Sequence, residues 1–275
     1  MLVACDLKLR AFNEYCCETK CVRIWLVQPW ISIVTPVHIS NNTDLVYLRY
    51  LINSCLRQNF HSKELIISDD LNDERVKRLC EELDSKKLRI IYTVAPIQGI
   101  SNNLNHAIIT SRGKLIKILF QDDFLTSRFA LLFLSLRLFF TLKKWHVSGS
   151  IHFEQSTRTF FNRFKPRISN NLLDGKNYIS SPSVVTFKCK SRLPFDPSLT
   201  FLLDCEWYLR MSHNFGLPVF GRITLVANRI HQGQATHWAK QKLKIESTLA
   251  KDAHDNFHMR KAECKCARRF SLSSD

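Results

Sequence analysis

Two pairs of neighbouring carboxylates are the residues in this sequence best suited to chemistry. Each pair follows a short apolar run of the kind that forms a buried strand: Asp69 and Asp70 follow residues 64–68, and Asp122 and Asp123 follow residues 114–120. In open α/β sheets, ligands bind outside the carboxyl ends of the strands. We therefore expect these four acids to converge on one crevice. Two acids that close an apolar strand are costly to bury unless they are paired or bind a metal ion.

The usual glycine-rich phosphate-binding loops are missing. The chain has seven glycines and contains neither G-x-G-x-x-G nor G-x-x-x-x-G-K-[ST]. If the sheet binds a nucleotide, its diphosphate must be held in another way, and a divalent metal ion on carboxylates is the obvious means. The G-x-S-x-G motif is absent as well, so nucleophilic catalysis by serine is discounted.

A sheet must position the acids, and the apolar pattern predicts one. Strands are expected at residues 30–36, 64–68, 88–94 and 114–120, and helices at residues 45–56, 73–83, 102–110 and 124–143. This alternation is typical of right-handed β-α-β units and a parallel sheet covered on both faces. Beyond Trp145 the elements are shorter and mixed, and residues 238–261 are expected to form a basic helix.

The charge of the chain limits its partners. The sequence has 40 Lys and Arg against 24 Asp and Glu, a net charge of +16. This excess favours polyanions such as nucleic acid, an acidic membrane surface, phosphorylated ligands or acidic glycans. No DNA- or RNA-binding module is recognisable, so nucleic acid is not expected as a partner.

The apolar runs and the cysteines indicate in which cellular compartment the protein is found. The longest apolar run, Phe129–Leu142, has 14 residues and contains Arg137, which is too short for a bilayer core of about 30 Å. Charged residues near the N-terminus interrupt the apolar stretch that a signal peptide needs. The ten cysteines form no paired C-x-x-C motifs with zinc spacing, so we interpret them as reduced thiols. We expect a cytoplasmic protein.

Several motifs, in order, resemble those of the family-2 glycosyltransferases of the GT-A fold. They are Ile33-Val-Thr-Pro36, Glu64-Leu-Ile-Ile-Ser-Asp-Asp70, Gln98-Gly-Ile-Ser101 with Asn105, Leu119-Phe-Gln-Asp-Asp123, Leu203-Asp-Cys-Glu-Trp-Tyr-Leu-Arg210 and Arg229-Ile-His-Gln-Gly-Gln234. The resemblance implies a mainly parallel nucleotide-binding sheet flanked by helices, with a smaller mixed acceptor-side region. It covers residues 31–238, which leaves residues 1–30 as an N-terminal extension of unknown structure and residues 239–275 as a basic helix and tail.

The resemblance also implies a role for each motif. The nucleotide-binding residues would be Thr35 and Pro36, which pack on the base; Asp70, which hydrogen-bonds it, with Asp69 beside it; Gly99 and Asn105, which shape the loop; and Asp122, near the ribose. Asp123 and His231 would contact Mn²⁺ or Mg²⁺ on the diphosphate. Asp204, or alternatively Glu206, would be the base that takes the proton from the acceptor hydroxyl.

Ordinary structural roles remain open for the same residues. Asp69 and Asp70 could form a turn before a helix capped by Asp73, and Asp122 and Asp123 could cap a helix. Glu206 and Arg210 have the spacing of an ion pair within one helix, and His231 could be a surface residue. Two positions also depart from the family: Gln121 stands where the first metal-motif acid is usual, and Leu203 replaces the Glu before the base.

These observations predict an inverting glycosyltransferase. The donor is expected to be a nucleotide-diphosphate sugar, a UDP-sugar first of all, and the acceptor a hydroxyl of a glycan, a lipid-linked molecule or another compound. The basic surface suggests peripheral contact with the anionic inner face of the membrane. Because of Gln121 and Leu203, the alternative is a degenerate, non-catalytic member that binds nucleotide sugars or acts by interaction.

Overall fold

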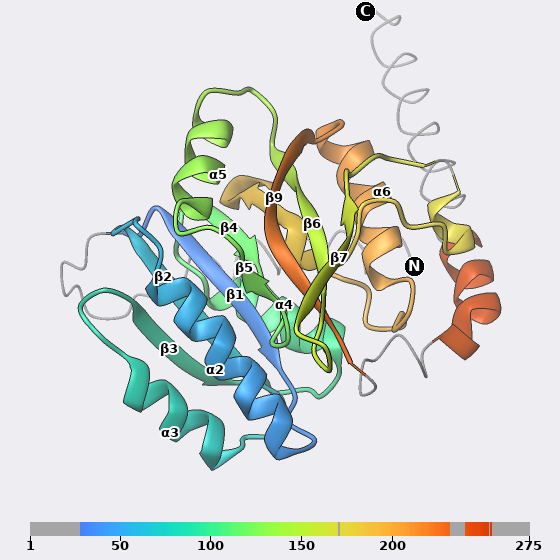
Figure 1. Cartoon of the computed structure of the whole chain (residues 1–275). Coiled ribbons are helices and arrows are strands. Elements are labelled where there is room, and N and C mark those ends of the chain that lie inside the picture. The colour runs from blue at the N-terminus through green and yellow to red at the C-terminus, as the bar shows by residue number, and fades with distance from the viewer. Residues whose placement is uncertain (1–27, 170, 232–239, 253, 255–275) are drawn as a thin grey trace, which may run out of the picture.

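The computed structural model describes residues 28–169, 171–231, 240–252 and 254, which form a curled sheet covered by helices (Figure 1). Nine strands are present in this part of the chain, in the order β3-β2-β1-β4-β8-β6-β9-β5, with β7 beside β6. The strands are β1 (Ile31–Val37), β2 (Lys63–Asp69), β3 (Arg89–Val94), β4 (Leu115–Ile118), β5 (Phe124–Leu125), β6 (Trp145–Glu154), β7 (Thr159–Phe164), β8 (Val185–Lys188) and β9 (Val219–Ile230). The helices are α2 (Asn42–Leu56), α3 (Glu74–Leu83), α4 (Ile100–Thr110), α5 (Ala130–Phe139) and α6 (Leu203–Phe215), with 3-10 turns η1 (Leu172–Asp174), η2 (Pro182–Val184), η3 (Cys189–Ser191) and η4 (Lys240–Lys242).

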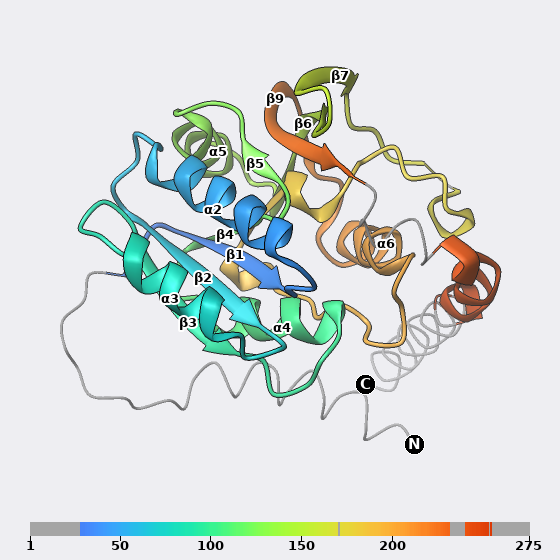
Figure 2. The same cartoon turned by 60° about the horizontal axis from the view of Figure 1, so that its bottom comes forward.

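The first half of the sheet is the parallel one that the sequence predicts. β3, β2, β1 and β4 run parallel, and each begins within one residue of its predicted start. Every residue of β1 and β2 is buried, because α2 and α3 cover one face of the sheet and α4 covers the other (Figure 2). This double coverage explains why both strands are apolar without alternation.

Local capping sets where the helices of this half begin. Asn41 is the N-cap of α2: its side chain accepts hydrogen bonds from the amides of Thr43 and Asp44, and the Asp44 carboxylate accepts the Asn41 amide in return. This reciprocal pair is a capping box, which satisfies amides that the first helical turn leaves free. Asp73 caps α3 with a single bond, in which its carboxylate accepts the Arg75 amide, as the sequence suggests.

The prediction of a helix over residues 124–143 is wrong at both ends. Phe124 and Leu125 are extended and pair with β9 as β5, and α5 begins only at Ala130. The buried Gln58 fixes this boundary: its side chain donates to the Ser127 carbonyl and accepts the Leu131 amide. These are contacts of long sequence separation, and the apolar period of a short segment does not reveal them.

The second half of the sheet is mixed. β8 pairs antiparallel with β4 and β6, and β7 pairs antiparallel with β6, whereas the long β9 runs parallel to β6. The sequence predicts a smaller mixed region here, and the strand order agrees with that prediction. α6 packs at the side of this half, next to η1 (Figure 1).

A carboxylate from the C-terminal part of the chain anchors the start of α6. No side chain of the helix itself provides its N-cap, and the buried Glu246 instead accepts the amides of Thr200, Phe201 and Leu202 at 2.8–3.0 Å. Residues 243–252 are helical, in agreement with the basic helix predicted over residues 238–261, of which residues 232–239, 253 and 255–261 lie outside the described part. Glu246 therefore holds the end of α6 that carries Asp204.

No helix in the described ranges is long and apolar enough to cross a membrane. Cys55, Cys80, Cys189 and Cys205 are free thiols. The remaining cysteines lie outside the described residues.

Candidate active site

The carboxyl ends of β1, β2 and β4 meet at one edge of the sheet. The register places Val37 beside Asp69, and β4 ends at Ile118, shortly before the second acid pair. Thr35 and Pro36 are buried within β1, so His38, directly after the strand, is the exposed residue at this point. The edge therefore brings together both acid pairs that the sequence singles out.

The two acids of the first pair have different surroundings. Asp69 is fully buried and accepts the amides of Leu71 and Asp73 and the hydroxyl of Tyr92, which makes it the centre of the turn after β2. Asp70 points toward the edge, where one oxygen lies 2.9 Å from His38 Nδ1 and the other accepts the Gly99 amide at 3.1 Å. Asp70 is therefore the member of the pair that a ligand at this edge can reach.

Gly99 and Asn105 act on the backbone around this edge. Gly99 has φ +110°, a conformation that favours glycine, and it is the N-cap of α4. The Asn105 amide donates to the Phe195 carbonyl and accepts the Phe195 amide, so both of its polar groups are used within the protein. Asn105 thus ties α4 to the segment that precedes α6.

Gln121 joins the ends of β1 and β4. Its carbonyl accepts the His38 amide at 2.7 Å, and its NH₂ donates to the His38 carbonyl at 3.0 Å. A carboxylate could make only the first of these bonds, because it has no donor. The amide at this position therefore has a structural reason, independent of metal binding.

Asp122 and His231 face each other across the site. The distance from Asp122 Oδ2 to His231 Nε2 is 3.3 Å, and both side chains are partly exposed. The His231 ring packs on Tyr47 of α2, with ring centroids 4.9 Å apart. The segment that follows, residues 232–239, lies outside the described part of the chain.

Asp123 is buried directly behind this pair. One of its oxygens accepts Asn228 Nδ2 at 2.8 Å and the Ser181 hydroxyl at 3.2 Å, and the other accepts the Arg229 amide at 3.1 Å. Burial, and after it the neighbouring charge of Asp122, together raise the pKa of Asp123 to about 7. Its carboxylate joins the chain after β4 to β9.

Arg229 supplies a buried cation beside the acids. Its Nε donates to the Asp122 carbonyl at 2.9 Å, and its Nη1 donates to Gln155 of the turn after β6. Four aromatic rings surround its guanidinium at 4.5–5.3 Å: Tyr47, Tyr50, Phe124 and Phe153. Such cation–π contacts stabilise a desolvated guanidinium, although burial lowers the pKa of Arg229. The motif Arg229-Ile-His231 pointed to this segment, but not to the arginine.

A hydrogen-bond network connects Asp123 to the predicted base. Asn228, which donates to Asp123, accepts the Ser180 hydroxyl at 3.0 Å; Asn177 donates to the Ser180 carbonyl at 3.1 Å and to Asp204 Oδ2 at 2.7 Å. Ser180 has φ +90°, a strained conformation for a residue with a side chain. Nothing in the sequence pattern identified Asn177 or Asn228, because each becomes significant only through distant partners.

The two candidate bases differ in their environments. Asp204 lies in the first turn of α6, and its removal from solvent raises its pKa to about 6. Glu206 instead forms a two-point ion pair with Arg210, whose guanidinium also donates to the Pro194 carbonyl. Asp204 therefore belongs to the network at the site, and Glu206 is held by its neighbour one turn away.

The residues at this edge fit a metal ion that is shared with a diphosphate. Asp122 offers a carboxylate oxygen and His231 an imidazole nitrogen at a separation that one cation could bridge. Mg²⁺ and similar ions are commonly held by one or two carboxylates together with substrate phosphates. In the described residues, no group of three or more His, Cys, Asp or Glu side chains is arranged to hold a metal without such help. Asp123 could join as a ligand only by giving up one of its present hydrogen bonds.

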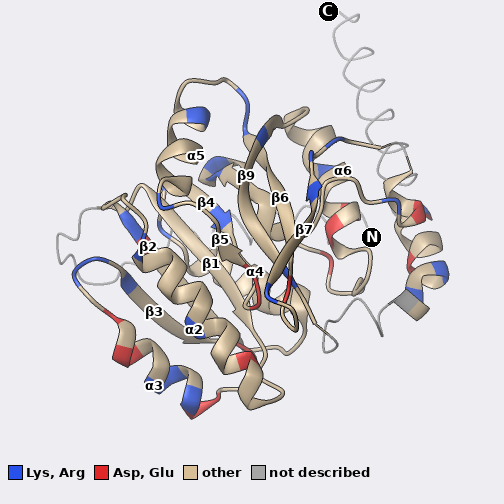
Figure 3. Ribbon diagram, in the orientation of Figure 1, with Lys and Arg blue, Asp and Glu red and all other residues tan. Residues whose placement is uncertain are grey.

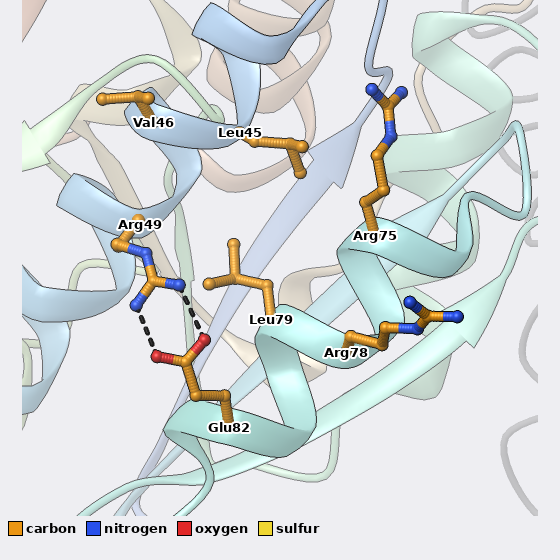
Figure 4. A pocket seen from close by; sticks show the side chains of 7 residues that line it. All are labelled: Leu45, Val46, Arg49, Arg75, Arg78, Leu79 and Glu82. Carbon is orange, nitrogen blue, oxygen red and sulfur yellow. Dashed lines mark hydrogen bonds and ion pairs between the residues drawn. The ribbon is translucent and has the colours of Figure 1, made fainter.

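A cavity of about 300 Å³ lies elsewhere, between α2 and α3 (Figure 4). Arg49 and Glu82 form a two-point ion pair across it, and Arg75 binds Asp73 and Asn42. Its charged groups thus hold the two helices together, and it includes none of the predicted site residues.

Residues 32–135 match the family model described as Glycosyl transferase family 2. The matched range runs from β1 into α5 and includes both acid pairs. Among solved structures, the complex of Staphylococcus aureus TarS 1-349 with UDP has 14% sequence identity and a TM-score of 0.56, covering 78% of this chain and 64% of that one. The mannosyltransferase PcManGT from Pyrobaculum calidifontis, in complex with GDP-Man and Mn²⁺, has 12% identity and a TM-score of 0.60, covering 90% and 71%.

At these identities the structural likeness establishes the fold, which is that of GT-A glycosyltransferases, as the sequence predicts. The chain spans less than two-thirds of the length of TarS 1-349 in its UDP complex. No curated protein matches the chain significantly.

Replacing Gln121 with an acid is expected to lower the stability of the folded protein. Gln121→Glu removes the donor to the His38 carbonyl and places a negative charge against that oxygen, so the free energy of unfolding should fall by about 1–2 kcal/mol. Chemical denaturation measures the change, with Gln98→Glu as the matched control because Gln98 is exposed. Equal stability of Gln121→Glu and the wild type would contradict the structural role of this amide.

Proposed function

We propose that the protein transfers a sugar from a nucleotide-diphosphate donor, a UDP-sugar first of all, to an acceptor hydroxyl with inversion. The observation that carries the proposal is the hydrogen-bond network from Asp123 through Asn228, Ser180 and Asn177 to Asp204. It holds the acids expected to serve the donor and the acid expected to serve the acceptor in one rigid arrangement. Catalytic groups must be held in this way if reacting atoms are to meet in the correct geometry.

On the donor side, Asp70 and the end of β1 would hold the base and ribose of the nucleotide. Asp122 and His231 would hold Mn²⁺ or Mg²⁺, and Asp123 behind them would orient Asp122 or contribute a ligand of its own. When bound, such an ion neutralises charge on the departing diphosphate. The positive charge of the Arg229 guanidinium would partly offset the negative charges of the two acids.

On the acceptor side, Asp204 would accept the proton of the attacking hydroxyl. The hydroxyl oxygen forms a bond to the anomeric carbon as the bond from that carbon to the diphosphate oxygen breaks, and the electron pair leaves with the nucleotide. Asn177 fixes the orientation of the carboxylate with its 2.7 Å hydrogen bond. A single displacement with one base inverts the anomeric configuration, and Glu206 is engaged by Arg210 and supplies no second nucleophile.

The test of this proposal compares the two candidate bases. Asp204→Asn should lower kcat for sugar transfer, or for hydrolysis of the donor, by about 10²–10⁴-fold and leave UDP binding unchanged, because a carboxamide cannot accept the proton. Glu206→Gln should retain most of the activity. Full activity of Asp204→Asn would contradict the assignment, and UDP binding by the wild type without transfer or hydrolysis of any donor would favour the non-catalytic alternative.

The same assay should show a pH dependence set by Asp204. Because its pKa is raised to about 6, the base is ionised and active above that pH and protonated and inactive below it. The rate should therefore rise with pH around a midpoint near 6. A rate independent of pH between 5 and 8 would contradict this role for Asp204.

We also propose that the protein acts in the cytoplasm, where nucleotide sugars are available, and that it contacts an anionic membrane surface through the end of α5. Phe139, Phe140 and Leu142 are 62%, 78% and 94% exposed there, and Lys143 and Lys144 follow directly. Figure 3 shows basic residues on α5 and on the connection to β6, at the edge of the sheet opposite the acids. Apolar and cationic side chains in one exposed segment are typical of peripheral membrane contacts.

This contact has a direct test. The double variant Lys143→Glu/Lys144→Glu should co-sediment with phosphatidylserine vesicles about tenfold more weakly than the wild type, since each lysine contributes to attraction by an anionic surface. Neutral phosphatidylcholine vesicles should bind both proteins equally weakly. Unchanged binding of the double variant to anionic vesicles would exclude this surface.

A further inference from the structure

Residues 155–177 connect the two sides of the site. At the start of this segment, Gln155 accepts a hydrogen bond from Arg229, which in turn donates to the Asp122 carbonyl. At its end, Asn177 donates to Asp204. Between these points the chain forms β7, which Figure 2 labels, and η1. Asn177 thus places the end of the segment beside the predicted base, where the acceptor hydroxyl would lie.

The segment is strongly cationic. It contains five exposed cations and one acid: Arg158, Arg163, Lys165, Arg167 and Lys176, against Asp174. Asp174 is already paired with Lys251 at 2.5 Å. Within the described residues, none of the five cations takes part in an ion pair of its own. Unlike Arg49, Arg75, Arg112 and Arg210, each of which pairs with an acid, they are available to an external anion.

Aromatic rings accompany these charges. Phe160 on β7 is about half exposed and continues the cluster of Phe124 and Phe153 that covers Arg229. The Arg167 guanidinium lies 4.3 Å from the centre of the Tyr178 ring, and Tyr178 directly follows Asn177. Exposed rings beside cations give a surface that can bind sugar rings and the negative groups attached to them.

We infer that the acceptor is an anionic oligomer, a glycan chain bearing phosphate or carboxylate groups, that lies along residues 155–169 and 171–177 with its terminal hydroxyl at Asp204. The inference rests on the proposed function and names the class of its acceptor. The cations of the segment would bind the charged repeating units of the oligomer, and Asp204 would accept the proton of its terminal hydroxyl. A neutral glycan would gain no electrostatic attraction from the five cations.

Binding of defined oligomers to the full chain tests the inference. The probes are oligogalacturonate, which carries carboxylates, inorganic polyphosphate, which carries phosphates, and dextran of equal length, which is neutral. The wild type should bind one or both anionic oligomers at least tenfold more tightly than dextran, and binding should weaken with added salt. The stronger of the two anionic probes identifies the charged group.

Two double variants of equal charge change locate the binding. Arg163→Glu/Lys165→Glu should weaken binding of the anionic oligomer about tenfold, because each exposed contact contributes a modest part of the attraction. Lys143→Glu/Lys144→Glu on the opposite edge should change it less than about threefold. If the glutamates disturb folding, which loss of UDP binding would reveal, Arg163→Gln/Lys165→Gln should still give a smaller loss in the same direction.

Several results would overturn the inference. Equal losses in both double variants would indicate unspecific attraction by the net charge, and equal binding of dextran would indicate a neutral acceptor. Loss of binding to anionic vesicles in Arg163→Glu/Lys165→Glu, without any binding of oligomers, would assign the surface to a membrane. Failure of the wild type to bind UDP or process any donor would instead contradict the proposed function, so the two can be told apart.

Discussion

The buried carboxylate of Asp123 is the constraint on which the site depends. A carboxylate without hydrogen bonds in such a position would cost several kcal/mol. Asp123 avoids this cost through donors from the start of the η2 segment and from β9: Ser181, Asn228 and the Arg229 amide. These two segments must therefore keep fixed positions relative to β4, and the positions they keep are those that would join Asp122, His231 and Asp204 into one site.

Charge balance follows from the same arrangement. Asp122 and Asp123 are neighbours, and like charges so close would repel each other strongly. The Arg229 guanidinium donates to the Asp122 carbonyl and is a positive charge near both carboxylates, and its own desolvation is offset by the surrounding rings of Tyr47, Phe124 and Phe153. The short strand β5, which the apolar pattern does not predict, supplies Phe124 to this cage. The segment that was predicted to be helical thus forms a strand that places Phe124 against Arg229.

The parallel half of the fold could be predicted because its signals are local. Buried strands are continuous apolar runs, helices have an apolar face, and acids that end neighbouring parallel strands must meet at one edge. The motifs of the site could be found for the same reason, and the match of residues 32–135 to glycosyl transferase family 2 agrees with them.

The remaining parts depend on contacts between distant residues. Asn228 lies 105 positions from Asp123, and Glu246 lies 44–46 positions from the amides that it accepts. No spacing rule connects such residues before the chain is folded. Gln121 is a different case: its departure from the family motif suggested a degenerate member, whereas its amide joins the ends of two strands at His38.

The central claim is that Asp122 and His231 hold a metal ion shared with the diphosphate of the donor. Calorimetric titration of the protein with UDP, in Mn²⁺ or in EDTA, tests it most directly, with Asp122→Asn as the variant and the exposed Glu81→Gln as the control. We expect binding that requires Mn²⁺, persists in Glu81→Gln and is weakened at least about tenfold in Asp122→Asn. UDP binding of equal strength in EDTA, or in Asp122→Asn, would contradict it.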